Sequence, residues 1–404
     1  MAQVLLNGQV TQWNVGGPYM IGNATDVFVG DIWVMAGQSN MRGHGFLKDM
    51  FSGASLIPSP SPDVHLYDST EQWRVASEPT HALRLSMRSV HHTLPDPTVS
   101  NPAVTDYRGA SLGLAFSKRY RDIHHVPVGL IASAHGGTTL ENWKRPAVLD
   151  EASGDTTLYG AMMDRIRKTG GSIAGVLWYQ GESDTELMPE TYGERFKVWL
   201  DTLRHDTRPD LPVAFVQIGA HRVDNNPKMI TGWMTVQDEQ RKLFGMDERI
   251  AGVSGVDCAL DDRLHLSAAG LNKLGYRLAN AASFALQGRA PDATPICKRA
   301  YYQEGMSDAG ERVRQTVRLE FSGMEGERMF PLDLDVQGFS IKNGSKSLVL
   351  KVQVEQDGKS VRIYLTSTPP QPFYIEYAMN QYGNLVTDDG MAVPAFKGLA
   401  VSQT

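Results

Sequence analysis

Short apolar runs alternate with longer segments of helical periodicity between about residues 30 and 288 of the 404-residue chain. Most of the short runs are apolar at nearly every position, which is typical of strands covered on both faces of a parallel sheet. The predicted strands are Ile32–Ala36, Val126–Ser133, Gly175–Gln180, Val213–Ile218 and Ile250–Ser254. The predicted helices are Gly113–Arg121, Thr157–Thr169, Tyr192–His205 and Ser267–Leu286. This alternation predicts an α/β fold of three layers, with helices on both faces of a mostly parallel sheet.

The hydrophobic pattern changes after the segment Gly288–Pro291, where apolar and polar residues begin to alternate one by one. Period-two alternation occurs at Val317–Phe321, Leu350–Val354 and Val361–Leu365. The last two runs are joined through Asp357-Gly358, a pair that favours tight turns. This pattern predicts a smaller antiparallel β domain, built as a small sandwich.

Residues 46–108 follow neither pattern, because they are rich in Pro, Ser and Asp and contain one short strand-like run, Val64–Tyr67. Long excursions of this kind are usually functional or mobile, and we expect this one to border the functional edge of the sheet. The chain is therefore expected to have three parts: a β-like segment at 1–29, an α/β domain at 30–290 and a β-sandwich-like accessory domain at 291–404.

The overall composition is that of an ordinary globular protein, with 41% hydrophobic and 21% charged residues. The net charge is −6 and no long run of Lys or Arg occurs, so no electrostatic feature favours nucleic acid or an anionic membrane as a partner. We find no apolar stretch of the roughly 20 residues that span a bilayer, and no basic segment followed by an apolar core at the start of the chain. The compartment is left open: it is extracellular or periplasmic if a leader was removed.

The two cysteines, Cys258 and Cys297, are too few for a disulfide framework or a structural zinc site. They could form one pair, although two buried thiols are the favoured interpretation. The sequence contains no His-x-Glu or Cys-x-x-Cys pattern that would indicate a metal site. It also contains no glycine-rich phosphate loop. We therefore expect no catalytic metal and no cofactor.

Ser39 follows the first predicted strand of the α/β region, within the sequence Gly37-Gln38-Ser39-Asn40. A turn serine bonded to its own backbone is the commoner role for this residue type. The position favours chemistry, because open α/β sheets place their sites at the carboxyl ends of strands. A serine hydroxyl becomes a nucleophile when a base removes its proton, and the flanking amides of Gln38 and Asn40 are candidate donors.

Asp262 lies three residues before His265, on a segment that precedes the last predicted helix of the α/β region. A carboxylate at that spacing can orient the imidazole through Nδ1, which leaves Nε2 to act as base and later as acid. Such spacings arise by chance, and the motif gains weight because Ser39 is predicted at the same sheet edge.

Gln180 and Glu182 follow another buried strand. The Gln180 amide could stabilise an oxyanion near Ser39. Glu182 is either a second base or, as we favour, a buried carboxylate that anchors the neighbouring turn.

Two glycine-containing segments complete the candidate site. Gly109 and Gly113 flank a helix start, where a glycine N–H could approach a reacting oxygen, although an ordinary glycine at a helix start is equally expected. Gly136-Gly137 follows a predicted strand and would permit a sharp turn beneath the site. Trp143 could stack on a sugar ring, although core packing is the more conservative interpretation.

These segments together resemble the SGNH/GDSL-type hydrolases, and more narrowly their sialate O-acetylesterase-like and acetylxylan esterase-like branch. The nucleophile motif Gly-Gln-Ser-Asn-Met of that branch matches Gly37–Met41. Its further motifs match Gly136–Trp143, Trp178–Ser183 and Asp262–His265. The stretch Ile375–Phe396 is similar to the end of sialate O-acetylesterases.

The resemblance implies a flavodoxin-like fold and hydrolysis of acetyl esters without a metal. It assigns Ser39 as nucleophile, His265 as base and Asp262 as the residue that orients it. The oxyanion hole would comprise the N–H of Ser39, the Gln180 amide and a glycine, with Gly113 preferred and Gly109 as its rival. Further supporting or substrate-binding candidates are Glu182, Arg42, His44 and Trp143.

The function expected from these residues is that of a carbohydrate O-acetylesterase working through an acetyl-enzyme, with an acetylated carbohydrate as its partner. Sialic acid, xylan and other acetylated polysaccharides stay open as substrates. A lipase or thioesterase of the same superfamily is a second interpretation. Such an enzyme would need a wide apolar acyl pocket, and the excursion at 46–108 contains few aliphatic clusters. A glycan-binding module without catalysis is a third.

Overall fold

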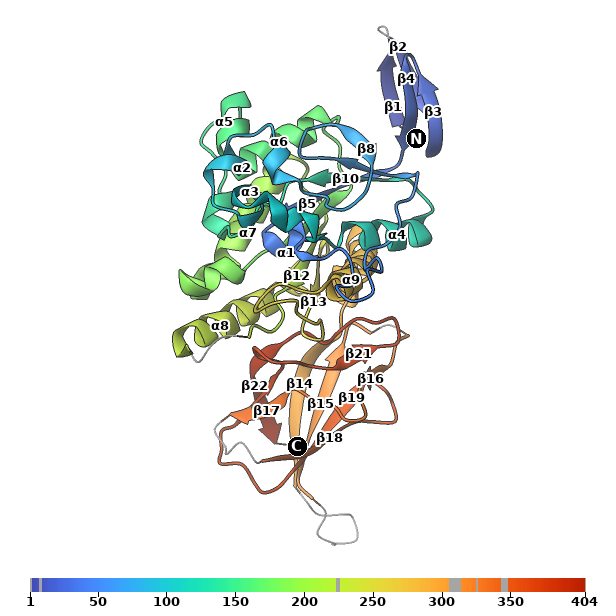
Figure 1. The fold of residues 1–404 in the computed structure, drawn as a ribbon. Coiled ribbons are helices and arrows are strands. Elements are labelled where there is room, and N and C mark those ends of the chain that lie inside the picture. Colours follow the sequence, from blue (N-terminus) through green and yellow to red (C-terminus); the bar gives the residue numbers. More distant parts are fainter. Residues whose placement is uncertain are drawn as a thin grey trace.

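The computed structural model describes residues 2–6, 9–222, 226–304, 314–324, 326–342 and 348–403. The protein has a mixed α/β fold with two seven-stranded sheets, one after the other along the chain. Figure 1 shows the first sheet and its helices between the N-terminal hairpins and the second sheet. The predicted β segment at 1–29 forms two hairpins, β1–β2 and β3–β4, while Met1, Asn7 and Gly8 lie outside the described residues. The strands of these hairpins are β1 (Ala2–Leu6), β2 (Gln9–Trp13), β3 (Gly16–Ile21) and β4 (Ala24–Val29).

The first large sheet contains all five strands predicted for the α/β region. In spatial order its strands are β13 (Ile250–Ser254), β12 (Val213–Gln217), β11 (Gly175–Tyr179), β5 (Asp31–Gly37), β10 (Val128–Ala132), β7 (Val64–Tyr67) and β8 (Trp73–Val75). Neighbouring strands are parallel, except that β8 runs antiparallel to β7. The carboxyl ends of the parallel strands therefore share one edge, where sites of open α/β sheets lie.

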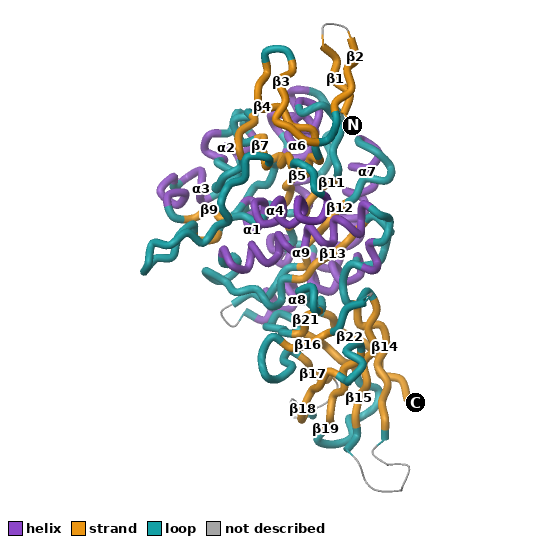
Figure 2. The backbone as a smooth tube through the Cα atoms, turned by 90° about the vertical axis from the view of Figure 1, so that its right-hand side faces the viewer, coloured by secondary structure: helices purple, strands orange, loops and turns teal. Residues whose placement is uncertain are grey.

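The predicted helices of the α/β region are confirmed as α4 (Gly113–His124), α6 (Leu158–Lys168), α7 (Tyr192–Asp206) and α9 (Ala268–Leu286). Helices α4 and α9 pack side by side along the sheet (Figure 2). Additional helical segments are α1 (Ser39–Arg42), η3 (Leu140–Trp143), α5 (Glu151–Thr156), η4 (Glu182–Glu186), η5 (Pro189–Thr191) and η6 (Ala290–Asp292).

Helix α8 (Pro227–Leu243) was not predicted from the sequence. It buries Gln237 and Gln240 beside Trp233 and Val236, so its buried face is not a continuous apolar stripe. An amphipathic pattern is the main sequence signal for a helix. In this helix the pattern is interrupted, because the buried amides of Gln237 and Gln240 bond neighbouring backbone.

The excursion at 46–108 is tied to the rest of the α/β region by buried charges. Arg88 bonds the Glu71 carboxylate and also Asp164 of α6, and all three side chains are buried. The elements of the excursion are short: β6 (Gly45–Phe46), β7 and β8 of the sheet, η1 (Leu83–Leu85), α2 (Val90–Thr93), α3 (Pro97–Ser100), η2 (Pro102–Asp106) and β9 (Arg108–Ala110).

The second large sheet contains the three strands predicted near the C-terminus and four others. In spatial order they are β17 (Phe339–Lys342), β20 (Tyr374–Tyr377), β22 (Phe396–Gln403), β14 (Ile296–Gln303), β15 (Thr316–Ser322), β19 (Ser360–Leu365) and β18 (Val349–Val354). The expected antiparallel arrangement needs one correction, because β14 and β22 pair in parallel. The edge strands β17 and β18 contact each other, so the sheet curls around its own apolar core. A two-stranded antiparallel sheet, β16 (Met329–Pro331) with β21 (Leu385–Thr387), completes this region.

Buried hydrogen bonds join the two regions. Gln217, at the end of β12, bonds both the N–H and the carbonyl of Ala395 through its amide, at 2.8 and 2.9 Å. Arg277 of α9 donates to the carbonyl of Gly390 at 2.7 Å. The cysteines Cys258 and Cys297 are both free thiols. Across the described ranges, no helix has the length and apolarity needed to span a bilayer.

Candidate active site

Ser39 lies where β5 turns directly into α1. Gly37 has a φ of +135°, and a Cβ at this position would lie 2.1 Å from the carbonyl oxygen of Tyr179, so the close approach of β5 to β11 requires glycine here. The N–H of Gln38 donates to that same carbonyl at 2.8 Å. Ser39 is then the first residue of the short helix, where the backbone N–H has no carbonyl within the helix to bond. The turn therefore fixes a hydroxyl and a free donor at the sheet edge.

His265 and Asp262 lie beside this serine in a hydrogen-bonded chain. His265 Nε2 is 2.9 Å from Ser39 Oγ, and His265 Nδ1 is 2.9 Å from Asp262 Oδ2. The other carboxylate oxygen of Asp262 accepts the N–H groups of Leu264 and His265 at 3.0 and 2.8 Å. The loop from 262 to 265 thus folds around its own aspartate, and the structure brings together the three residues predicted to work together.

The electrostatics of this chain favour an ionised Asp262. Burial opposes its charge, but the hydrogen bonds from the His265 ring and the two backbone N–H groups outweigh that effect, so the pKa of Asp262 is lowered. The ring of His44 packs on that of His265, with centroids 4.0 Å apart. Burial and the neighbouring charges of His265 and Arg42 lower the pKa of His44 to about 3, so this second imidazole is neutral at physiological pH.

Asn40 links the nucleophile turn to the histidine loop. Its amide N–H groups donate to Glu182 Oε1 at 2.7 Å and to the carbonyl of Leu264 at 3.2 Å, and its oxygen accepts the N–H of Leu266 at 3.0 Å. The two residues flanking His265 are therefore held by the residue that follows Ser39. Burial raises the pKa of Glu182 to about 7. This placement fits the anchoring role that we favoured for Glu182.

A cavity of about 410 Å³ opens over the serine and the histidine. Its lining combines charged, polar and apolar groups. The residues are Gln38, Ser39, Arg42, Asp96, Pro97, Gly136, Gly137, Glu182, Ser183, Thr185, Glu186, His221, Met229, Trp233, Leu264 and His265. Asp96 and Pro97 belong to the excursion, which therefore borders the cavity as expected.

The structure does not place Gln180 as an oxyanion donor. Its amide nitrogen donates to Asp184 Oδ2 at 2.6 Å and to the carbonyl of Thr138 at 3.0 Å, with a longer contact to Gln38 Oε1 at 3.3 Å, so its N–H groups are engaged within the protein. The side chain is fully buried and does not line the cavity. The strand end was correctly located, but the side chain turns back towards the Thr138 turn, because a buried acceptor there needs a donor.

Neither candidate glycine of the helix start reaches the cavity. The N–H of Gly113 donates to Ser111 Oγ at 3.1 Å, and a Cβ on this residue would lie 2.9 Å from the side chain of Met35, beneath the sheet. Gly109 belongs to β9 and faces Pro79. The glycines that line the cavity are Gly136 and Gly137. Both follow β10, the neighbour of β5, and that adjacency is the signal that could have identified them.

Gly136 and Gly137 form a tight turn against the excursion. The N–H of Gly136 donates to Asp96 Oδ2 at 3.0 Å, and a Cβ here would lie 2.1 Å from that oxygen. Gly137 is exposed and has a φ of +68°. Arg42 approaches the same Asp96 oxygen at 3.1 Å, so this cation at the cavity wall is already paired.

Trp143 has the core-packing role that was the more conservative interpretation. It is fully buried, packs edge-on against Trp178 and donates to Thr138 Oγ1 at 3.1 Å, so the structure does not place it as a sugar contact. His44 lies behind His265 and does not line the cavity. Arg42 does line it, although its side chain is buried. Met229 and Trp233 were missed because they lie on α8, and His221 lies on the segment that leads to it.

His44, Asp262 and His265 are also the group of described residues whose ligand atoms lie close enough together to hold a metal ion. Both ring nitrogens of His265 already bond Asp262 and Ser39. A metal ion would have to displace one of those bonds, so the donor set fits a proton-transfer chain better than a metal centre.

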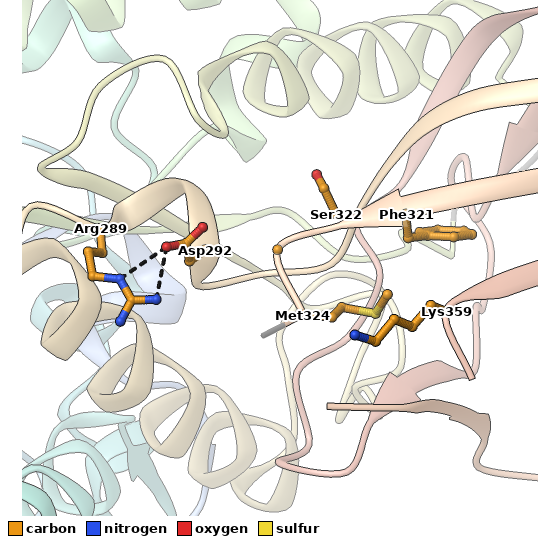
Figure 3. A pocket seen from close by; sticks show the side chains of 7 residues that line it. Arg289, Asp292, Phe321, Ser322, Met324 and Lys359 are labelled. Carbon is orange, nitrogen blue, oxygen red and sulfur yellow. Dashed lines mark hydrogen bonds and ion pairs between the residues drawn. The ribbon is translucent and has the colours of Figure 1, made fainter. Parts of the chain in front are cut away.

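A second cavity, of about 480 Å³, lies at the start of the second sheet (Figure 3). Its charged lining residues include Arg289 and Asp292, which pair with each other at 3.1 Å, and Lys359. Its other lining residues are Phe321, Ser322, Gly323 and Met324. No histidine is among these lining residues and their one carboxylate is paired with Arg289, so the chemistry points to the first cavity.

Comparisons with known proteins place these observations in a family. The model of the family described as "Carbohydrate esterase, sialic acid-specific acetylesterase" matches residues 29–283. A probable carbohydrate esterase of Arabidopsis thaliana is 28% identical over 268 residues, which cover 62% of this chain and 89% of that protein. The sialate O-acetylesterase of Mus musculus is 22% identical over 271 residues, and the chain spans about half (48%) of its length.

The fold of a solved structure is similar over almost the whole chain. The crystal structure of a carbohydrate acetylesterase from Xanthomonas citri superposes with a TM-score of 0.66 at 23% identity, covering 95% of this chain and 86% of that one. The similarity extends beyond the residues that the family model matches, and so includes part of the second sheet.

Proposed function

Because the chain belongs to the family of carbohydrate esterases described as sialic acid-specific acetylesterases, we propose that it removes acetyl groups from acetylated sugars through an acetyl-enzyme on Ser39. The observation that carries the proposal is the chain of two 2.9 Å contacts from Ser39 through His265 to Asp262, at the floor of a cavity. Nucleophile, base and orienting carboxylate are the three parts that acyl transfer by serine requires.

The proposed reaction has two halves. In the first, His265 Nε2 takes the proton of Ser39 as Oγ attacks the acetyl carbonyl. Collapse of the tetrahedral intermediate breaks the ester bond, and the imidazolium gives that proton to the departing sugar oxygen. In the second half, His265 takes a proton from water, whose oxygen attacks the acetyl-enzyme, and returns it to Ser39 as acetate leaves. Asp262 stabilises the imidazolium in both halves.

We assign the oxyanion hole to different groups from those predicted. The N–H of Ser39 stays, and Gly137 replaces Gly113 because it is the exposed glycine on the neighbouring strand end. Gln38 is the proposed side-chain donor in place of Gln180. Its oxygen accepts the N–H groups of Ser183 and Gly181 at 3.2 and 3.4 Å, and its side chain lines the cavity. Removal of one such donor typically costs a hundredfold or more in rate.

The finer fold assignment is part of the same proposal. The six parallel strands are ordered β13-β12-β11-β5-β10-β7, and the candidate nucleophile follows β5, the fourth of the seven strands in the sheet. This order supports a flavodoxin-like α/β/α domain at about 30–290, with a separate β accessory domain at 291–404.

The residue types of the lining favour a sugar ester over a long acyl ester. Polar and charged residues outnumber the apolar ones, which are Pro97, Met229, Trp233 and Leu264. A lipase or thioesterase would need a wide apolar acyl pocket. The experiment should compare different acetylated substrates: sialic acid, xylan and other polysaccharides.

The test is a measurement of acetate released from a panel of acetylated glycans, with p-nitrophenyl acetate and p-nitrophenyl octanoate alongside. We expect acetate release from at least one glycan and a strong preference for the acetyl over the octanoyl ester. Binding of a glycan without acetate release would favour the glycan-binding module, and preference for octanoate would favour the lipase alternative.

A further inference from the structure

One wall of the cavity is aromatic and comes from outside the predicted site. The ring of His221 stacks on that of Trp233, with centroids 4.5 Å apart and planes 19° from parallel. Both residues line the cavity together with Met229. A pyranose has an apolar face of C–H groups and a rim of hydroxyls. The aromatic pair could pack on the C–H face of the sugar ring. The cavity residues Glu182, Ser183 and Glu186 could form hydrogen bonds with its hydroxyl groups.

Buried amides hold this wall in place. The indole N–H of Trp233 donates to the carbonyl of Gly219 at 2.8 Å. The side-chain amide of Gln237 donates to the carbonyls of Ile218 and Gly219, each at 3.0 Å. Helix α8 therefore fixes the backbone that leads from β12 to His221.

The N–H of Arg222, the next residue, donates to the carbonyl of Arg263 at 2.9 Å. A further contact to this backbone comes from the region of the second sheet. Asn380 follows β20, and its side-chain oxygen accepts the N–H of His221 at 2.8 Å. Its own N–H donates to the side-chain oxygen of Gln237 at 2.8 Å. Asn380 has a φ of +49°, a left-handed conformation that Asn tolerates better than most residues. It does not line the cavity itself.

We propose that His221, Trp233 and Met229 form a subsite for the sugar ring of the substrate, and that Asn380 of the second sheet is a positioning residue for this subsite. The inference rests on the proposed function. It gives the C-terminal region a part in substrate recognition, carried by one hydrogen bond to the backbone of the wall. The acetyl group reacts at Ser39, so small esters bypass the wall and sugar esters use it.

The conformation of Asn380 supplies a clean test. Asn380→Gly keeps the left-handed backbone and the N–H to Gln237, and it removes only the acceptor of the His221 N–H. Asn380→Asp restores a carboxylate acceptor at the same place. His125→Gly is the matched control, because His125 is an exposed residue with a φ of +55° at the end of α4.

The experiment measures kcat and KM on p-nitrophenyl acetate and on glucose pentaacetate or acetylated xylan, whichever sugar ester the wild-type enzyme cleaves faster. In Asn380→Gly we expect a fivefold to tenfold rise in KM for the sugar ester, about the value of one neutral hydrogen bond. Values of kcat and all parameters on p-nitrophenyl acetate should change less than about twofold. Asn380→Asp should recover most of the affinity, and His125→Gly should match the wild type.

A double-mutant cycle tests whether Asn380 acts through the wall. His221→Ala should also raise KM for the sugar ester, and adding Asn380→Gly to it should have little further effect, because the ring to be positioned is already gone. Thermal melting shows whether each variant is folded. If the glycine variant is not, Asn380→Ala, which also removes the acceptor of the His221 N–H, carries the test with the same expected rise in KM.

Two results would overturn the proposal while leaving the esterase assignment intact: equal effects of Asn380→Gly on both substrates, or no effect on either. Cleavage of p-nitrophenyl acetate without cleavage of any sugar ester would also overturn it. Absence of hydrolysis on every ester in the wild-type protein would instead count against the proposed function.

Discussion

The two seven-stranded sheets meet near one cavity but contribute to it in different ways. The parallel sheet brings the ends of β5 and β11 to a single edge, so Ser39 and Glu182 lie on rigid turns, and the loop after β13 adds His265. The second sheet places no residue in the lining and reaches it through Asn380. The first sheet therefore supplies the groups that react, whereas the second sheet supplies a group that holds the aromatic wall of the cavity in place. Losses in the first region should affect turnover, and losses in the second should affect stability and substrate affinity.

Ser39→Ala removes the nucleophile and should have the strongest effect on activity. We expect kcat/KM for p-nitrophenyl acetate to fall at least about 10⁴-fold, because no other hydroxyl can accept the acetyl group in the same geometry. Ser172→Ala, at an exposed turn before β11, is the matched control and should keep wild-type activity. Retention of more than about a tenth of the activity in Ser39→Ala would exclude the assignment.

Asp262→Asn tests the orienting carboxylate. The amide keeps the size of the side chain but no longer stabilises the imidazolium, so kcat should fall by roughly 10² to 10⁴. The neighbouring aspartate is the control. The side chain of Asp261 accepts the N–H of Phe46 at 2.9 Å, and the bond that joins Asp261 to His265, at 2.9 Å, runs from backbone N–H to backbone carbonyl and survives the substitution. Asp261→Asn should change kcat less than about threefold. Equal effects of the two substitutions would contradict the assigned roles.

Gln217→Leu tests the contact between the sheets. The substitution leaves the N–H and carbonyl of Ala395 without their buried partner, and Ser254 Oγ loses its acceptor. The free energy of unfolding should fall by about 2–4 kcal/mol, as measured by chemical denaturation. Gln353→Leu, on an exposed position of β18, should be within about 0.5 kcal/mol of wild type. Two matching stabilities would mean that the sheets are joined by other contacts.

Glu182→Gln tests the buried carboxyl through pH. Burial raises the pKa of Glu182 to about 7, whereas an unfolded glutamate titrates near about 4.3. Between these values the folded state keeps a proton that the unfolded state has lost, so the free energy of unfolding should fall as pH rises from about 4.3 to 7. Glutamine is neutral throughout and still accepts from Asn40. Relative to wild type, the variant should therefore gain roughly 3–4 kcal/mol across this window, at about 1.36 kcal/mol for each unit of pKa difference.

Denaturation curves of both proteins at pH 4.5 and pH 8 measure this difference directly. A difference in stability that is the same at both pH values would show that Glu182 is already ionised in the folded protein.

The parallel strands could be predicted from the sequence, because a strand that is buried along its whole length is an almost continuous apolar run. Val213–Gln217 is an example. Ser39, His265 and Asp262 could be predicted as one group because few roles combine a serine, a histidine and an aspartate at the same edge of a sheet. Helix α8 escaped detection because its buried glutamines break the apolar stripe, and with it Met229 and Trp233 were missed.

Side-chain direction was the other limit. Gln180 follows the predicted strand, yet its side chain points into the protein, where it donates to Asp184 and to the carbonyl of Thr138. A motif fixes which residue follows a strand, but the hydrogen-bond demands of distant segments decide where its side chain points. The wall residue His221 depends on Asn380, which lies 159 residues later in the chain.

The most direct test of the central claim is covalent labelling of the enzyme with a fluorophosphonate, a reagent that reacts with activated serine hydroxyls, followed by peptide mass spectrometry. We expect one labelled site, Ser39, loss of esterase activity in proportion to labelling, and strongly slowed labelling in the His265→Ala variant. Labelling at another residue, or full activity in protein whose Ser39 is completely modified, would contradict it.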